Sequence, residues 1–157
     1  MSDPKLPAAL LVDMDGTLVD SEPYWISSEH ELVTEFGGTW TDADAHSLVG
    51  FDLIDAAVQL RDRGGVGLEP EAIVERLLDQ VIAKCRTELP WRPGARSMLE
   101  QARDAGVPCV LVTMSWRRFA DAVLDAAPEG VFVGSVTGDE VANGKPAPDS
   151  YLQAAEL

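Results

Sequence analysis

The pattern of apolar residues changes at about residue 90, and this change limits the folds that the chain can adopt. Between about 21 and 89, apolar residues return at helical spacing. After the proline-containing segment 89–94, helical patterns alternate with short apolar runs such as 107–113, which are typical of strands buried in a parallel sheet. This alternation predicts an α/β fold built on an open parallel sheet with right-handed crossovers.

The predicted elements divide the chain into two parts. The first part is a discontinuous α/β core of residues 1–20 and 90–157, and the second is an inserted all-helical part of residues 21–89. We expect strands at 8–12, 107–113 and 131–133, and helices from 21 to about 36 and over 52–63, 69–85, 95–105, 119–127 and 149–157. Asp149 is predicted to cap the last helix.

Charge and cysteine content restrict the possible partners. The net charge is -15, which repels nucleic acid and anionic membranes and favours a small ligand as partner. The apolar run that begins at Ala8 is interrupted by Asp13, so it is too short for a secretory leader or a membrane span. Cys85 and Cys109 lie in no metal-binding or redox motif, and we interpret them as reduced thiols of a cytoplasmic protein.

Two aspartates at the end of the first predicted strand indicate chemistry. Asp13 and Asp15 point to the same face if the strand continues, and two neighbouring carboxylates repel each other unless a cation or a shared proton relieves the repulsion. Such a pair can supply one nucleophile and one proton carrier. Gly16 follows because the backbone must turn sharply there. A solvated Asp-Gly turn is the simpler alternative.

A calcium-binding loop does not fit this segment. Thr17 stands where the third acidic ligand is required, Leu18 replaces the glycine of the loop, and Tyr24 replaces the closing glutamate.

Two further segments can complete a site at the carboxyl ends of the strands. Thr113, Met114 and Ser115 follow the second predicted strand, and their hydroxyl and amide groups could hold a phosphate before the next helix. A serine that caps this helix explains the same residues equally well. Lys145 lies between a glycine and a proline, where a fixed ammonium group could neutralise a carboxylate or a phosphoryl oxygen.

Other site types find little support. Residues 138–145 lack the spacing and the hydroxyl residue of a nucleotide-binding P-loop. His30 and His46 have no evident ligand partners, so we expect them to be surface or cap residues. The acids Asp139 and Glu140 are expected to be solvated loop residues.

The three motifs together resemble the haloacid dehalogenase superfamily. D-x-D-G-T follows the first strand, a threonine follows the second, and G-K-P-x-P-D precedes a late helix. The pattern is most similar to the β-phosphoglucomutase-like and sugar-phosphatase branch, in which the helical insert is a cap. The resemblance implies magnesium-dependent hydrolysis of a small phosphate monoester, such as a sugar or polyol phosphate, through an aspartyl phosphate.

The resemblance also assigns roles to residues. Asp13 corresponds to the nucleophile and Asp15 to the general acid and base. Thr113, with the Met114 amide, corresponds to the residue that holds the transferring phosphoryl group, and Lys145 to the cation that offsets charge around it. Gly16, Met114 and Ser115 are expected to line the phosphate. The family's Mg²⁺ ion would be held by the Asp13 carboxylate, the Asp15 carbonyl and an acid from a fourth motif.

One departure from the family pattern affects the expected activity. Family members normally continue into another strand that carries the fourth-motif acids, whereas this sequence stops at Leu157. We therefore expect the chain as written to hydrolyse phosphate esters poorly. A fragment, a site completed by another chain, and a defective remnant are all compatible with this ending. An unpaired edge strand would also favour self-association.

The sequence leaves three alternatives to hydrolysis. A β-phosphoglucomutase-type phosphotransferase is less favoured because Trp25 stands where the mutase has a histidine, and residues 49–53 lack basic side chains. A dehalogenase is less favoured because Asp15 is present. A non-catalytic chain of the same fold remains a third hypothesis.

Overall fold

The structure is a computed structural model that describes residues 6–157. It divides into two compact units, which are described separately. We call residues 6–20 with Leu89–Leu157 the core unit, and Ser21–Glu88 the helical unit. Within residues 6–157, no helix combines the length and the apolar character that crossing a bilayer requires.

The core unit contains a parallel three-stranded sheet. Its strands are β1 (Leu10–Val12), β2 (Cys109–Val112) and β3 (Phe132–Val136), arranged in the order β1-β2-β3. Both pairings are parallel, which confirms the predicted α/β sheet. All four residues of β2 are buried, as the continuous apolar run predicted for a strand within a parallel sheet.

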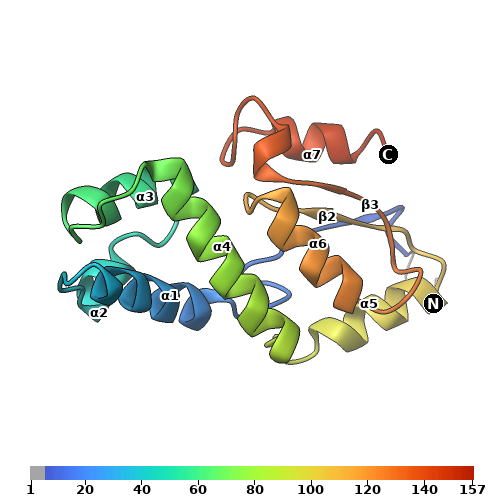
Figure 1. Cartoon of the computed structure of the whole chain (residues 1–157). Coiled ribbons are helices and arrows are strands. Elements are labelled where there is room, and N and C mark those ends of the chain that lie inside the picture. Colours follow the sequence, from blue (N-terminus) through green and yellow to red (C-terminus); the bar gives the residue numbers. More distant parts are fainter. Residues whose placement is uncertain (1–5) are drawn as a thin grey trace. The chain divides into compact units, whose positions relative to one another are not determined.

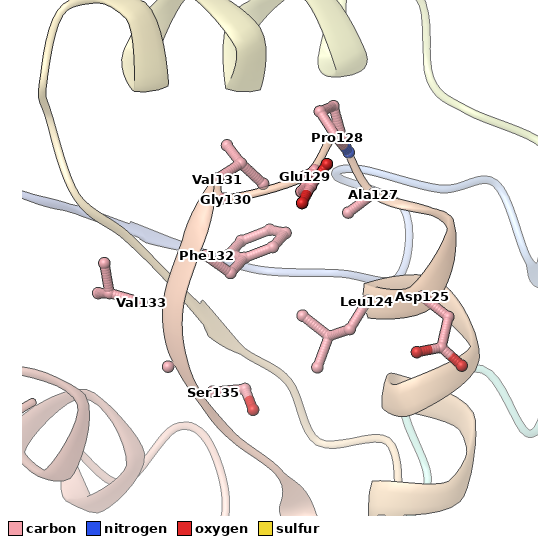
Figure 2. A pocket seen from close by; sticks show the side chains of 11 residues that line it. Leu124, Asp125, Ala127, Pro128, Glu129, Gly130, Val131, Phe132, Val133 and Ser135 are labelled. Atoms are coloured by element: carbon pink, nitrogen blue, oxygen red, sulfur yellow. The ribbon is translucent and has the colours of Figure 1, made fainter.

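Helices cover both faces of this sheet (Figure 1). They are α5 (Ala95–Asp104), α6 (Arg117–Ala126) and α7 (Asp149–Ala154), and a short 3₁₀ turn, η1 (Gly138–Glu140), precedes α7. On the α7 face, Ala154 and the half-buried Tyr151 pack against a cluster of valines contributed by the strands, namely Val110, Val112 and Val136. On the α6 face, Figure 2 shows Leu124 of α6 beside Phe132 of β3.

The strand β3 contains a bulge. Cys109 pairs with Phe132, whereas the next residue of β2, Val110, pairs with Gly134. Val133 is therefore an extra residue on β3, and its side chain is 60% exposed. Beyond the bulge, a Cβ atom at Gly134 would contact Leu157, so the glycine allows the residues after α7 to approach the sheet closely.

The helical unit consists of four helices within its described residues. They are α1 (Glu22–Glu35), α2 (Asp42–His46), α3 (Leu53–Asp62) and α4 (Pro70–Thr87). Asp52 caps α3 by accepting a hydrogen bond from the Ile54 amide, and α4 begins with the predicted proline. The longest helix, α4, packs against α1 and α3 through one apolar stripe, namely Ile73, Val74, Leu77, Leu78, Val81 and Cys85.

Several predicted boundaries were wrong. The helix α6 begins at Arg117 rather than at 119, and β3 extends to Val136 rather than ending at 133. Asp149 does not cap α7, because it is the first helical residue and its carboxylate instead accepts a hydrogen bond from the Asn143 side chain. The helix α2 was not predicted at all.

The residues before Ser21 and after Glu88 pair with each other inside the core unit. The Asp20 amide donates to the Pro90 carbonyl at 2.8 Å, and the Arg92 amide donates to the Leu18 carbonyl at 2.8 Å. Val19 and Trp91 form an antiparallel bridge between these two bonds. The proline-containing segment is therefore held by backbone hydrogen bonds rather than being a free linker.

Candidate active site

Both carboxylate oxygens of Asp13 accept hydrogen bonds, one from the Lys145 side chain and one from Thr17 of the same motif. The Lys145 ammonium, 132 residues away in the sequence, donates to Asp13 Oδ1 at 2.6 Å. Thr17 Oγ1 donates to Asp13 Oδ2 at 3.0 Å. The Asp13 side chain remains 35% exposed, so its carboxylate is both held in place and accessible.

The backbone after β1 explains how Asp13 and Asp15 are presented. The strand ends at Val12, and the fully buried Met14 anchors the following turn. The Met14 carbonyl accepts hydrogen bonds from the amides of three residues that follow it in the turn, namely Thr17, Leu18 and Val19. Gly16 has a φ of 75°, which agrees with the prediction that the chain needs a glycine to turn here.

Asp15 is held by the residues that follow β2. Ser115 Oγ donates to Asp15 Oδ2 at 2.7 Å, and Thr113 Oγ1 lies 3.3 Å from the same oxygen. The Ser115 amide donates to Thr113 Oγ1 at 3.0 Å, which fixes the two hydroxyls relative to each other. The structure thus brings Thr113 and Ser115 to Asp15, whereas the sequence suggested only that they could face a phosphate.

Met114 connects the loop after β2 to the loop after β3, a role that the sequence did not reveal. The Lys145 amide donates to Met114 Sδ at 3.1 Å. A Cβ atom at Gly144 would lie 3.0 Å from the same sulfur, and a Cβ atom at Gly138 would collide with the Met114 carbonyl. Glycine is therefore required where the loops after β2 and β3 meet. The repeated glycines in 138–144 were the available sequence signal for this close approach.

The N-terminus of α6 already has an acidic partner within the chain. Asp139 Oδ1 accepts a hydrogen bond from the Arg117 amide at 2.9 Å and one from Thr137 Oγ1 at 2.6 Å. Glu140 forms an ion pair with the Arg117 side chain at 2.6 Å, and this pairing lowers the pKa of the Glu140 carboxyl. Both acids are exposed, as expected, but each is also paired within the chain. The Asp139 carboxylate accepts a hydrogen bond at the helix end where the sequence suggested a phosphate.

The two predicted surface histidines also have partners in the helical unit. His30 Nε2 lies 3.0 Å from Asp42, and His46 Nδ1 lies 3.5 Å from Glu22. Both pairs link α1 to α2, so they have a structural role within this unit.

Figure 2 shows a pocket of about 470 Å³ in the core unit. It is lined by the end of α6, the following loop and β3, including Leu124, Pro128 and Phe132. None of the predicted site residues lines it. The candidate active site is therefore the cluster of Asp13, Asp15, Thr113, Ser115 and Lys145 at the carboxyl ends of β1 and β2.

The acidic groups of this cluster have the donor chemistry that Mg²⁺ prefers, because all of them are oxygen donors. Within residues 6–157, no group of three or more histidine, cysteine, aspartate or glutamate side chains is arranged to hold a metal ion. Two aspartate oxygens still fit, because protein-bound Mg²⁺ commonly uses one or two carboxylates and completes its shell with water and substrate phosphate.

Comparisons with known proteins identify the family and the fold of this chain. A family model described as haloacid dehalogenase-like hydrolase matches residues 7–157. The chain is 27% identical over 156 residues to a phosphorylated carbohydrates phosphatase of Thermotoga maritima, covering 94% of this chain and 69% of that protein. It is 26% identical to a bifunctional riboflavin kinase/FMN phosphatase of Arabidopsis thaliana, covering 97% of this chain but 40% of that protein.

A solved structure shows the same fold. It is the crystal structure of CbbY from Rhodobacter sphaeroides in complex with phosphate, with a TM-score of 0.81 and 25% identity. The superposition covers 96% of this chain and 72% of CbbY. The comparisons confirm both the predicted family resemblance and the predicted fold class.

Proposed function

The chain belongs to the haloacid dehalogenase-like hydrolases. We therefore propose that it hydrolyses a small phosphate monoester through an aspartyl phosphate on Asp13. The observation that carries the proposal is the contact between Lys145 Nζ and Asp13 Oδ1 at 2.6 Å. A carboxylate held in this way has a fixed orientation, which favours its use as a nucleophile.

In the first step, an oxygen of the Asp13 carboxylate attacks phosphorus, and the bond between phosphorus and the ester oxygen breaks. The protonated Asp15 carboxyl gives its proton to the leaving alcohol. Lys145 offsets negative charge next to the transferring group. The oxygen of Asp13 that forms the new bond stays within the protein, so water does not take part in this step.

In the second step, Asp15 takes a proton from a water molecule as that water attacks the phosphorus of the aspartyl phosphate. The Asp13 carboxylate is released together with inorganic phosphate. The hydroxyl groups of Ser115 and Thr113 suit both steps, because a hydroxyl can donate to the ionised Asp15 carboxylate and accept from the protonated one.

A magnesium ion fits this site. The Asp13 carboxylate and the Asp15 main-chain carbonyl would hold it, and when bound it would offset the charge of the phosphoryl oxygens. The residues of the chain keep their roles: Lys145 and Thr17 orient Asp13, while Ser115 and Thr113 orient Asp15.

A phosphorylated sugar or polyol is the proposed substrate class. The name of the Thermotoga maritima relative, a phosphorylated carbohydrates phosphatase, supports this choice. We assign the helical unit the role of a cap that shields the reaction from bulk water. The buried free thiols of Cys85 and Cys109 support a cytoplasmic location.

The test compares the wild-type chain with Asp13→Asn. Phosphate release from para-nitrophenyl phosphate and from a panel of hexose and polyol phosphates is measured with magnesium and with excess chelator. We expect Asp13→Asn, and the wild type with chelator, to fall to the buffer background because the nucleophile or the charge compensation is lost. Asp104→Asn, on the surface of the core unit, is the matched control and should retain wild-type release.

A second readout does not depend on rapid turnover. Beryllium fluoride with magnesium should form an adduct on Asp13 that fluorine NMR detects in the wild type and in Asp104→Asn. The same adduct in Asp13→Asn would contradict the assignment of the nucleophile.

A further inference from the structure

The ammonium group of Lys145 has an aromatic neighbour that the proposed mechanism does not use. Besides Asp13, Lys145 Nζ donates to the Val112 carbonyl at 2.8 Å. It also lies 5.1 Å from the centroid of the Tyr151 ring. This distance is within the range in which a cation is attracted to the face of an aromatic ring.

Tyr151 is well placed to restrain the lysine because its own position is fixed. It lies on α7, and its half-buried side chain packs against the buried valines of β2 and β3. The lysine side chain is 22% exposed, so it is only partly enclosed by its neighbours. An aromatic face beside a long, flexible side chain disfavours the conformers in which the ammonium would leave Asp13 for water.

The backbone of Lys145 is also restrained. Its amide donates to Met114 Sδ at 3.1 Å, and the preceding Gly144 lies against the same sulfur. The backbone is thus fixed by Met114, and the ammonium has two oxygen partners and one ring. Removing the ring would leave the two oxygen partners in place while freeing one side of the ammonium.

We propose that Tyr151 is a positioning residue that keeps the Lys145 ammonium on Asp13 through its aromatic face. As a role in catalysis, this inference rests on the proposed function. The phenolic hydroxyl is not required, because the attraction comes from the face of the ring. An aromatic residue should therefore replace Tyr151, and an aliphatic one should not.

The first experiment compares Tyr151→Phe with Tyr151→Leu in the magnesium-dependent assay. Tyr151→Phe should stay within about twofold of the wild-type kcat, whereas Tyr151→Leu should lower kcat about tenfold with little change in KM. Leu152→Ala is the matched control, because Leu152 is the next residue of α7 and its side chain is 62% exposed. This control should retain the wild-type kcat and KM.

A graded series keeps the test valid if Tyr151→Leu fails to fold. Phenylalanines with one, two and three ring fluorines at position 151 have nearly the same shape but a progressively weaker attraction for cations. We expect kcat to fall stepwise along this series. A flat series, or a wild-type kcat in folded Tyr151→Leu, would overturn the inference.

An NMR measurement separates this inference from the proposed function. A ring that faces the ammonium shifts the neighbouring ε-methylene protons of Lys145 upfield, and Lys145→Arg assigns the signal. The shift should persist in Tyr151→Phe and disappear in Tyr151→Leu. If Asp13→Asn leaves phosphate release unchanged, the proposed function fails, but the NMR shift still tests the contact between Lys145 and Tyr151. If the wild type shows no upfield shift, that contact is refuted.

Discussion

Glu29 is a buried carboxyl group whose burial has a measurable consequence. It lies on α1 with 7% of its surface exposed, and its Oε2 accepts a hydrogen bond from Trp40 Nε1 at 3.0 Å. Burial raises the pKa of Glu29 from 4.5 to about 7, and the bond from Trp40 offsets only part of this rise. The neutral form of Glu29 is therefore the form that the folded helical unit favours at mildly acidic pH.

This shift predicts a pH-dependent stability. The unfolded chain loses the Glu29 proton near pH 4.5, whereas the folded chain keeps it until about pH 7. The contribution of neutral Glu29 to the free energy of unfolding is complete below pH 4.5 and is lost as the pH rises through about 7. This contribution is about 3 kcal/mol. Glu29→Gln should remove this part of the pH dependence, measured by urea unfolding between pH 4.5 and 8.

The exposed Glu35 of α1 provides the control for this prediction. Glu35 forms an ion pair with Arg76 at the surface, so Glu35→Gln should leave the pH dependence between these limits close to that of the wild type. Equal pH dependence in Glu29→Gln and the wild type would show that Glu29 is ionised in the folded protein.

Sequence patterns predicted the charged residues of the site better than the residues that support them. Asp13 and Lys145 could be singled out because their neighbours, glycine and proline, occur in recognisable motifs. Tyr151 carries no such signal, and Met114 was singled out only as a residue that lines a phosphate, not as one that supports Lys145. Their contacts depend on tertiary packing between segments that are distant in the sequence, as in the bond from the Lys145 amide to Met114 Sδ.

At the scale of elements, strong periodicity predicted helices such as α4 well, and a short helix was missed. The helix α2 has five residues, too few to show a hydrophobic period. It did have a local signal, because Thr41 and Asp44 form a capping box in which each accepts a hydrogen bond from the backbone of the other. Capping residues were thus more informative than periodicity for this element.

The turns that follow α1 and α3 approach each other so closely that a glycine is required. A Cβ atom at Gly38 would collide with the Gly64 carbonyl oxygen and would lie 2.8 Å from a Val33 methyl group. Because a backbone atom cannot rotate away, Gly38→Ala should lower the free energy of unfolding by about 1–3 kcal/mol. Chemical denaturation of the purified variant measures this difference.

Gly67→Ala is the matched comparison in the same unit. The nearest atoms to a Cβ at Gly67 belong to the Phe36 ring at 3.8 Å, which is an ordinary contact. We expect this variant to unfold within about 0.5 kcal/mol of the wild type. A loss in Gly67→Ala as large as that in Gly38→Ala would mean that steric contact is not the cause.

At the scale of the whole molecule, the excess of acidic residues opposes folding. There are 27 acidic and 12 basic side chains, so most acids have no basic partner to offset their charge. The ion pairs at the surface each contribute little, whereas the repulsion among excess negative charges acts over the whole chain. Dissolved salt should therefore weaken the repulsion among the acidic side chains more than it weakens the surface ion pairs.

Salt should accordingly raise the thermal stability. Raising sodium chloride from 10 mM to 100 mM shortens the screening length from about 30 Å to about 10 Å. We expect Tm, measured by circular dichroism at pH 7.5, to rise over this interval. Potassium chloride should have the same effect, and a falling Tm would show that the ion pairs outweigh the repulsion.

The bulge at Val133 affects how copies of this protein could assemble. A polypeptide that tried to lengthen the sheet beyond β3 would need an uninterrupted ladder of amide and carbonyl groups. At this point two residues of β3 lie opposite one residue of β2. The regular spacing of backbone amide and carbonyl groups along β3 is therefore interrupted at Val133. This irregularity protects β3 against templated stacking and fibre growth.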